Sequence, residues 1–124
     1  MYVRLYSWKA TDVAFDDLKQ VNKELDDLYG EKRWLRLNAN GEIDENSRFD
    51  PWCPDPYSFR EDEEIAEILA RHLVSGKIVF TTEDEYGEYA GWLVQPGKAV
   101  PLSGRKTVEF VSPEGDVVAV ETEE

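Results

Sequence analysis

The chain has 124 residues, the size of a single domain, and 27 acidic against 14 basic side chains give it a formal net charge of −13. Aromatic residues make up 12% of the chain, which excludes the composition of a disordered polypeptide. No apolar run approaches the roughly 20 residues of a membrane span, and the N-terminus has no signal-peptide core. Composition therefore predicts one soluble, cytoplasmic domain over residues 1–120, followed by an acidic tail at 121–124 that frays.

The first expected elements are a strand and a helix. Alternation of polar and apolar residues over 2–7 predicts the strand. Thr11 or Asp12 is expected to cap the helix, and Gly30 is expected to end it. The apolar residues of this helix are spaced three, four and three apart and form one stripe: Leu18, Val21, Leu25 and Leu28.

A hairpin and a proline-rich loop are expected next. Residues 34–37 are predicted to form a second strand, and Asn40-Gly41 is the strongest short hairpin-turn signal in the chain. Residues 42–44 are therefore expected to fold back on that strand. Between 46 and 57, three prolines exclude regular structure, while the aromatic residues make the segment too apolar for a plain linker.

A second helix and a run of strands complete the chain. Ser58 and Glu61 form a capping box, and the helix is expected to run on through Val74 and to end at Gly76. Turn residues then separate five short strands, expected at 77–82, 88–94, 98–102, 108–111 and 117–120. This order predicts an α+β fold, with two helices packed on one face of a mainly antiparallel sheet that ends in a β-meander.

The chemistry-bearing residues do not form a recognisable catalytic motif. A single cysteine, Cys53, excludes an intramolecular disulfide and a structural zinc site based on cysteine. The single histidine, His72, is expected in the last turn of the second helix, where it interacts with the free carbonyl groups. No serine lies in a Gly-x-Ser-x-Gly elbow. The sequence thus predicts a protein that is not an enzyme and uses no catalytic residue, metal or cofactor.

Two features remain as candidate interaction sites. Acidic residues cluster in a predicted hairpin turn and at the start of the second helix: Glu83, Asp84, Glu85 and Glu88, and Glu61, Asp62, Glu63 and Glu64. Such clusters steer a protein toward basic partners, although a solvated surface is the simpler explanation. Trp52 and Tyr57, in the proline-rich loop, are candidate apolar anchors, with a role as a lid over the core as the alternative.

The run from residue 64 to residue 101 resembles small acidic α+β proteins of phages and mobile elements. It contains an acidic helix, then Gly-Lys-Ile-Val-Phe, an acidic turn, Glu-Tyr-Ala-Gly-Trp-Leu-Val and Pro-Gly-Lys-Ala-Val. Some of those proteins are inhibitors of the anti-CRISPR type, so the resemblance implies an inhibitor. It carries no functional residue with it.

The leading hypothesis is a non-enzymatic binding protein, either monomer or homodimer, that occludes a basic surface of a protein partner, such as a nucleic-acid-binding CRISPR effector. Direct binding of nucleic acid or of a membrane is disfavoured by the charge. One alternative is an immunity or antitoxin-type protein that neutralises one cognate toxin. The other is a small-ligand or divalent-metal enzyme that uses the acidic hairpin.

Overall fold

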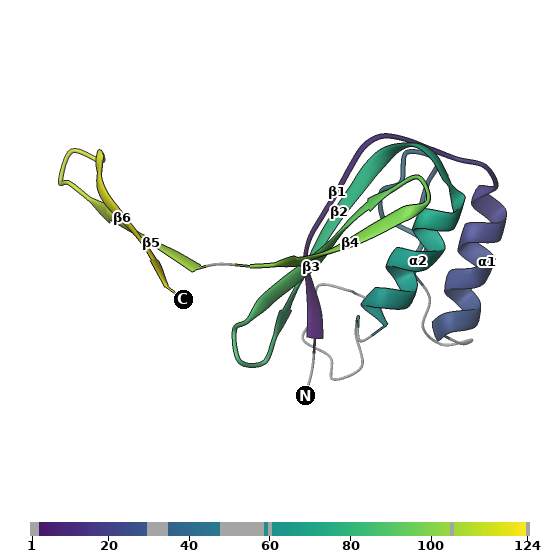
Figure 1. Cartoon of the computed structure of the whole chain (residues 1–124), viewed down its shortest axis with the longest axis horizontal. Helices are drawn as coiled ribbons and strands as arrows, with labels where there is room; N and C mark the ends of the chain where they lie inside the picture. The colour runs from purple at the N-terminus through teal and green to yellow at the C-terminus, as the bar shows by residue number, and fades with distance from the viewer. Residues whose placement is uncertain (1–2, 30–34, 48–58, 60, 105, 124) are drawn as a thin grey trace.

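A computed structural model describes residues 3–29, 35–47, 59, 61–104 and 106–123. The elements in chain order are β1 (Val3–Phe15), α1 (Leu18–Tyr29), α2 (Asp62–His72), β2 (Leu73–Asp84), β3 (Tyr89–Gln95), β4 (Lys98–Ser103), β5 (Lys106–Val111) and β6 (Val117–Glu123). Strands β1–β4 form a four-stranded antiparallel sheet in chain order, and β5 pairs with β6 in a separate two-stranded sheet. Helices α1 and α2 lie side by side on one face of the larger sheet (Figure 1). The α+β class is confirmed.

The core lies between the helices and the four-stranded sheet. The predicted stripe of α1 faces it, because Val21 and Leu25 are fully buried. Phe80 stands at the centre of the sheet, stacked on Trp8 at 5.1 Å between ring centroids and edge-on to Phe59 at 6.3 Å. These contacts make one continuous apolar layer that holds α1 and α2 against the sheet.

Strand β1 is longer than the sequence indicated. The predicted helix caps, Thr11 and Asp12, lie within β1, and the cap prediction is therefore wrong. Asp17 performs that role instead, since its Oδ1 accepts a hydrogen bond from the Gln20 amide at 3.1 Å. Asp12 has a positive φ of 52° and faces Gly76 of β2, which has a φ of 80°, at an irregularity in the pairing of the two strands.

Side chains of β1 and α1 bind the backbone of the segment 35–47, and the Trp8 indole donates to the Gly41 carbonyl at 2.8 Å. Leu37 forms only an isolated bridge with Ile43, so the turn at Asn40-Gly41 is confirmed but the strand expected at 34–37 is not found in the described residues. Asn22 of α1 binds both backbone groups of Leu37, donating to its carbonyl at 3.1 Å and accepting from its amide at 2.9 Å. The Asn22 side chain thus supplies the hydrogen bonds that a neighbouring strand would otherwise give to Leu37. The buried backbone of this segment is therefore satisfied without regular structure.

Helix α2 is shorter at both ends than predicted. Its N-cap is Glu61, which makes no side-chain capping bond, and Ser58 of the expected capping box lies outside the described residues, as does Gly30. The helix ends at His72, and Leu73 is already extended. The prediction that the helix includes Val74 and ends at Gly76 is therefore wrong. A buried Leu73 beside an exposed Val74 is the alternation of a strand.

In the described part of the chain, three tight turns share one construction. Each begins with a residue whose side-chain oxygen accepts an amide hydrogen bond within the turn, and each has a glycine of positive φ at its fourth position. They span residues 38–42, 84–88 and 112–116. In each turn the first amide donates to the carbonyl of the fifth residue, at 2.8–3.0 Å. The glycine is required because an L side chain is strained at that φ.

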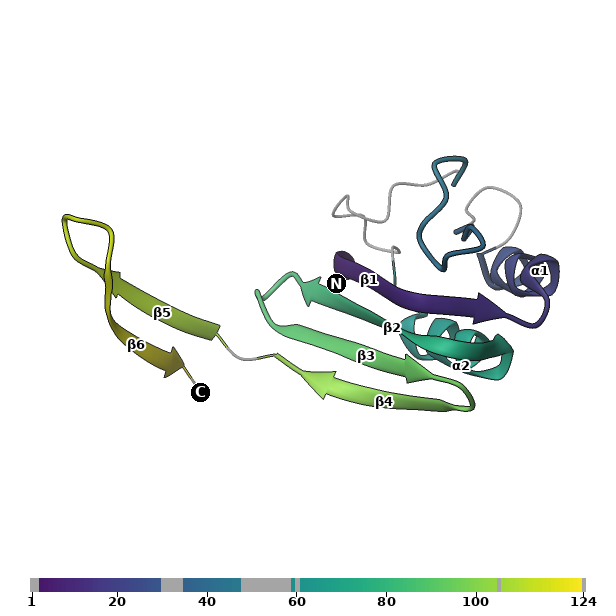
Figure 2. The same cartoon turned by 90° about the horizontal axis from the view of Figure 1, so that it is seen from above.

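The β5–β6 hairpin projects away from the body of the molecule (Figures 1 and 2). The five strands expected after α2 are all present, although the last two are not part of the main sheet. Residues 121–123, expected to fray, belong to β6, where Glu121 pairs with Val108. Glu124 lies outside the described residues.

Candidate functional site

The acidic residues at the start of α2 differ in what they contact. The carboxylate of Asp62 accepts a hydrogen bond from the Trp92 indole at 2.8 Å, and this bond ties the helix to β3. Glu63 and Glu64 are exposed in the first turn, as is Glu67 one turn later. Carboxylates are favoured at this end of a helix by its dipole, which explains why acidic residues gather here. Of the four predicted residues here, Glu63 and Glu64 are therefore the ones presented to solvent, while Glu61 and Asp62 are partly buried.

An open groove lies between α2 and strands β3 and β4. Its volume is about 470 Å³, and its lining includes Glu63, Glu67, Arg71, Trp92 and Ala99. The carboxylates of Glu63 and Glu67, one helical turn apart, therefore border a groove that the Trp92 indole also lines. Carboxylates attract a guanidinium or an ammonium group, and an indole is a favourable neighbour for one. Arg71, which also lines the groove, forms an ion pair with Glu24 of α1. Glu67 and Trp92 were not among the predicted site residues, although the spacing of Glu63 and Glu67 on one helix face was readable from the sequence.

The acidic residues of the β2–β3 turn differ in what they contact. Asp84 Oδ1 accepts from the amides of Tyr86 and Glu88, each at 2.9 Å. Glu83 forms an ion pair with Arg4 across the sheet, and its hydrogen bond with Tyr89 raises the pKa of that hydroxyl above its ordinary value. Glu85 and Glu88 are exposed. The turn is thus a second, smaller acidic surface.

The structure does not bring the two acidic clusters into one site. Asp62 binds Trp92, which pairs with Phe80, whereas the turn begins at Asp84, four residues further along β2. Four strand residues span about 13 Å, so the clusters are neighbouring surfaces at one end of the sheet. Trp52 and Tyr57, the predicted apolar anchors, lie outside the described residues, as does Cys53.

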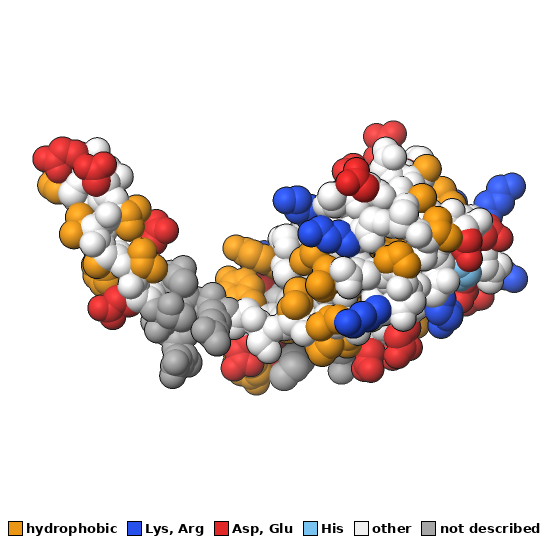
Figure 3. Space-filling view, turned by 45° about the horizontal axis from the view of Figure 1, so that its top comes forward, with side chains coloured by type: hydrophobic (Ala, Val, Ile, Leu, Met, Phe, Trp, Pro, Cys, Tyr) orange, Lys and Arg blue, Asp and Glu red, His pale blue; other side chains and the backbone are white. Residues whose placement is uncertain are grey.

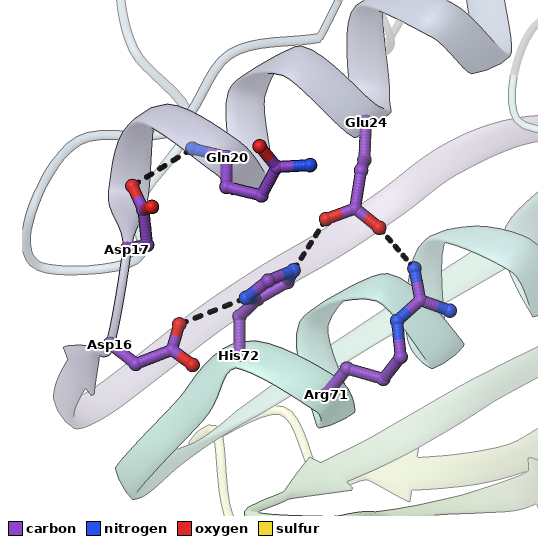
Figure 4. A network of polar contacts seen from close by, with 6 residues as sticks. All are labelled: Asp16, Asp17, Gln20, Glu24, Arg71 and His72. Carbon is purple, nitrogen blue, oxygen red and sulfur yellow. Dashed lines mark hydrogen bonds and ion pairs between the residues drawn. The ribbon is translucent and has the colours of Figure 1, made fainter.

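His72 lies at the centre of a polar network that joins α2 to α1 and to the short link between β1 and α1 (Figure 4). Its Nδ1 lies 2.8 Å from Oδ1 of Asp16, and its Nε2 contacts the carboxylate of Glu24, which also forms an ion pair with Arg71. The Asp16 amide donates to the His72 carbonyl at 2.9 Å. His72 therefore binds carboxylates, and the expectation that its side chain interacts with free carbonyl groups is wrong.

The network favours the charged forms of its members. Burial by itself lowers the pKa of His72, but its hydrogen bonds to Asp16 and Glu24 and their negative charges outweigh burial and raise that pKa. Burial by itself raises the pKa of Glu24, but its bonds to His72 and Arg71 outweigh burial and lower it. An imidazolium between two carboxylates has both nitrogens occupied, so this network acts as a clamp between α1 and α2.

The stability of the protein is expected to depend on pH through this clamp. Because the pKa of His72 is raised by folding, its contribution is complete below its ordinary pKa of about 6.5 and is lost as the pH rises through the higher value of the folded state. The contribution of Glu24, whose pKa is lowered, is complete above its ordinary value of about 4.3 and is lost as the pH falls through its folded-state value. The free energy of unfolding therefore decreases as the pH rises above about 6.5, until His72 has lost its proton in the folded state as well.

Urea titrations of the wild type and of the His72→Gln variant test this. The variant is expected to lose about 1–2 kcal/mol at pH 6, since it removes a charge-assisted contact that is partly open to solvent. It should also lose most of the decrease in stability between pH 6 and pH 9. His72 is the only histidine, which makes it the main side chain that titrates in this range. An unchanged pH profile in the variant would show that the clamp does not carry the effect.

Comparison with known proteins adds no assignment. No family model, no curated protein and no solved structure matches the chain. Across the described ranges, no helix has the length and apolar character needed to cross a membrane. The same residues contain no group of three or more His, Cys, Asp or Glu side chains arranged to hold a metal ion.

Proposed function

We propose that the protein is a non-enzymatic binding protein that covers a basic surface of a protein partner with the exposed acidic face of α2. The observation that carries this proposal is the groove beside α2, where Glu63 and Glu67 border a hollow lined by Trp92. A lysine or arginine side chain of the partner would enter this groove. Glu64, exposed outside the groove on the same helix, would attract further basic side chains of the partner. The exposed Glu85 and Glu88 of the β2–β3 turn add negative charge to the neighbouring surface.

The distribution of charge supports this choice of surface. With a net charge of −13 the whole molecule attracts cationic partners, but three exposed lysines, Lys9, Lys77 and Lys98, lie on the opposite face of the sheet. The helix face is correspondingly more acidic. Proteins that bind nucleic acid display basic surfaces, so the proposed partner is of that kind, and the resemblance to phage inhibitors points to an inhibitory role.

A charge-reversal variant tests the proposal. The triple variant Glu63→Lys, Glu64→Lys and Glu88→Lys reverses exposed carboxylates and leaves in place Asp84, which holds the turn, and Glu83, which pairs with Arg4. In affinity capture from a lysate of the native host at low salt, the wild type is expected to retain a basic protein that high salt releases. The variant is expected to retain about tenfold less of it or lower still.

The matched control reverses three other exposed carboxylates: Asp27→Lys, Glu42→Lys and Glu45→Lys. It has the same net charge as the test variant and should capture nearly as much partner as the wild type. Equal losses in both variants would mean that only net charge matters, and equal retention in all three proteins would rule out the α2 surface.

A further inference from the structure

We infer that two copies of this chain associate by exchanging their β5–β6 hairpins, each hairpin docking on the face of the other copy's sheet that α1 and α2 leave uncovered. This assembly lies beyond the proposed function, because it uses the opposite face of the sheet from the groove beside α2. Seen from above, the strands pass in front of α2, so this open face is turned toward the viewer (Figure 2).

The hairpin exposes more apolar surface than a free strand pair sustains. Six large apolar side chains are between 41% and 71% exposed: Val108, Phe110, Val111, Val117, Val118 and Val120. They occupy both faces, since Phe110 pairs with Ala119 on one and Glu109 pairs with Val120 on the other. An isolated two-stranded hairpin is marginally stable in water, and an unbroken apolar run such as 117–120 is typical of a strand that is buried on both faces.

The open face of the sheet has the matching apolar patch. Val79 pairs with Leu93, and Leu93 pairs with Val100, so the three side chains form a row across the central strands. All three are partly exposed, and none belongs to the core that packs against the helices. Leu102 follows on the same side of β4, two residues after Val100.

The charges of the two surfaces are complementary. Lys9 pairs with Val79, and Lys77 and Lys98 precede Val79 and Val100 by two residues, so these exposed lysines border the apolar row. Among the described side chains of the hairpin, the charged ones are all acidic: Glu109, Glu114, Asp116 and Glu121. Figure 3 shows red and orange side chains on the hairpin, while the blue ones in that view lie on the body. Direct pairing of two hairpins would instead bring like charges together.

The hairpin cannot cover the open face of its own sheet. The Gly104 amide still donates to the Tyr89 carbonyl at 3.0 Å, so the chain belongs to the sheet up to Gly104. Strand β5 begins two residues later, at Lys106, and two residues span at most about 7 Å. Sheets that pack face to face are about 10 Å apart. The open face of a second copy's sheet is not limited by this short connection, so the hairpin can dock there. Because each copy does the same, the result is a closed twofold dimer.

Sedimentation of the full chain tests the exchange. At about 100 μM protein the wild type is expected to sediment as two chains of 14.3 kDa each. Lys77→Glu with Lys98→Glu, on the open face, should weaken the dimer by about tenfold or more. Glu109→Lys with Glu121→Lys should do the same, because these residues lie on opposite faces of the hairpin and the docked face loses an acidic residue whichever it is. An equimolar mixture of the two variants should restore it, because each hairpin then meets a face of opposite charge.

Two further variants separate this interface from others. Lys19→Glu with Lys23→Glu makes the same charge change on α1 and should leave the dimer intact. Leu93→Lys should dissociate it and should not be rescued by mixing. Circular dichroism identifies any variant that fails to fold. A monomeric wild type overturns the inference, as does a dimer that is insensitive to the face and hairpin variants, or a mixture that stays monomeric.

Discussion

Replacing Gly76 by alanine is expected to lower the free energy of unfolding by about 3 kcal/mol. Gly76 has a φ of 80°, which by itself costs an L residue about 1–2 kcal/mol. In addition, a Cβ at this position would clash with the backbone carbonyl oxygens of Thr11 and Asp12. Because these atoms belong to the paired strand β1, they cannot move without disturbing the pairing of β1 with β2.

Gly97 is the matched control for this prediction. Its φ of 71° is similar, but nothing lies within 4 Å of the position its Cβ would take. Gly97→Ala should therefore lose only the cost of the backbone conformation, about 1 kcal/mol. Urea denaturation of the two variants measures the difference directly. Equal losses would show that the close approach of β1 and β2 at Gly76 contributes nothing to stability.

Replacing Phe80 by alanine is expected to lower the free energy of unfolding by about 3–5 kcal/mol. Phe80 is fully buried at the centre of the sheet, between Trp8 and Phe59. Removing its ring leaves a cavity that residues of paired strands cannot collapse to fill. The loss of stability has two parts: the hydrophobic free energy of burying the removed ring atoms, and the lost packing around the cavity.

Tyr86→Ala serves as the control for the loss of a ring. Tyr86 is 71% exposed in the β2–β3 turn, so its removal should change the free energy of unfolding by less than about 0.5 kcal/mol. Thermal or urea unfolding compares the two variants at one pH. A Phe80→Ala variant that unfolds like Tyr86→Ala would contradict the placement of the core between the sheet and the helices.

Periodicity predicted the elements whose pattern is produced by local burial. The stripe of α1 could be read from the sequence because one side of this helix packs on the core, whereas β3 and β4 were predicted from the turn residues that flank them. The ends of α2 and β1 could not, since Leu73-Val74 suits a helix or a strand and the cap signal at Thr11 and Asp12 competes with long-range pairing. Tertiary contacts decide such boundaries.

The candidate site was predictable only as clusters of charge. The sequence shows where acidic residues are dense, but the contacts that engage them come from distant positions. Trp92 is 30 residues from Asp62, and Arg4 is 79 residues from Glu83. The same holds for His72, whose carboxylate partners lie 56 and 48 residues away. Sequence reasoning therefore could not separate the structural acids from the exposed ones.

The lysines on the open face of the sheet could not be predicted as a cluster, for a related reason. Its lysines, Lys9, Lys77 and Lys98, are far apart in the chain and meet only because β1, β2 and β4 are aligned by strand pairing. Net charge carries no information on where the charges lie, whereas the structure places these three lysines on the open face of the sheet and the exposed acids of α2 on the helix side. A partner with a basic surface is therefore expected on the helix side.

The most direct test of this account is the association rate of the captured partner, measured against ionic strength. For the wild type, the rate is expected to fall steeply as salt is added, because screening removes the attraction between the acidic α2 surface and its partner. The Glu63, Glu64 and Glu88 reversal should give a slower rate and a nearly flat salt dependence, while the Asp27, Glu42 and Glu45 reversal should keep most of the slope. A wild-type rate independent of salt would contradict the account.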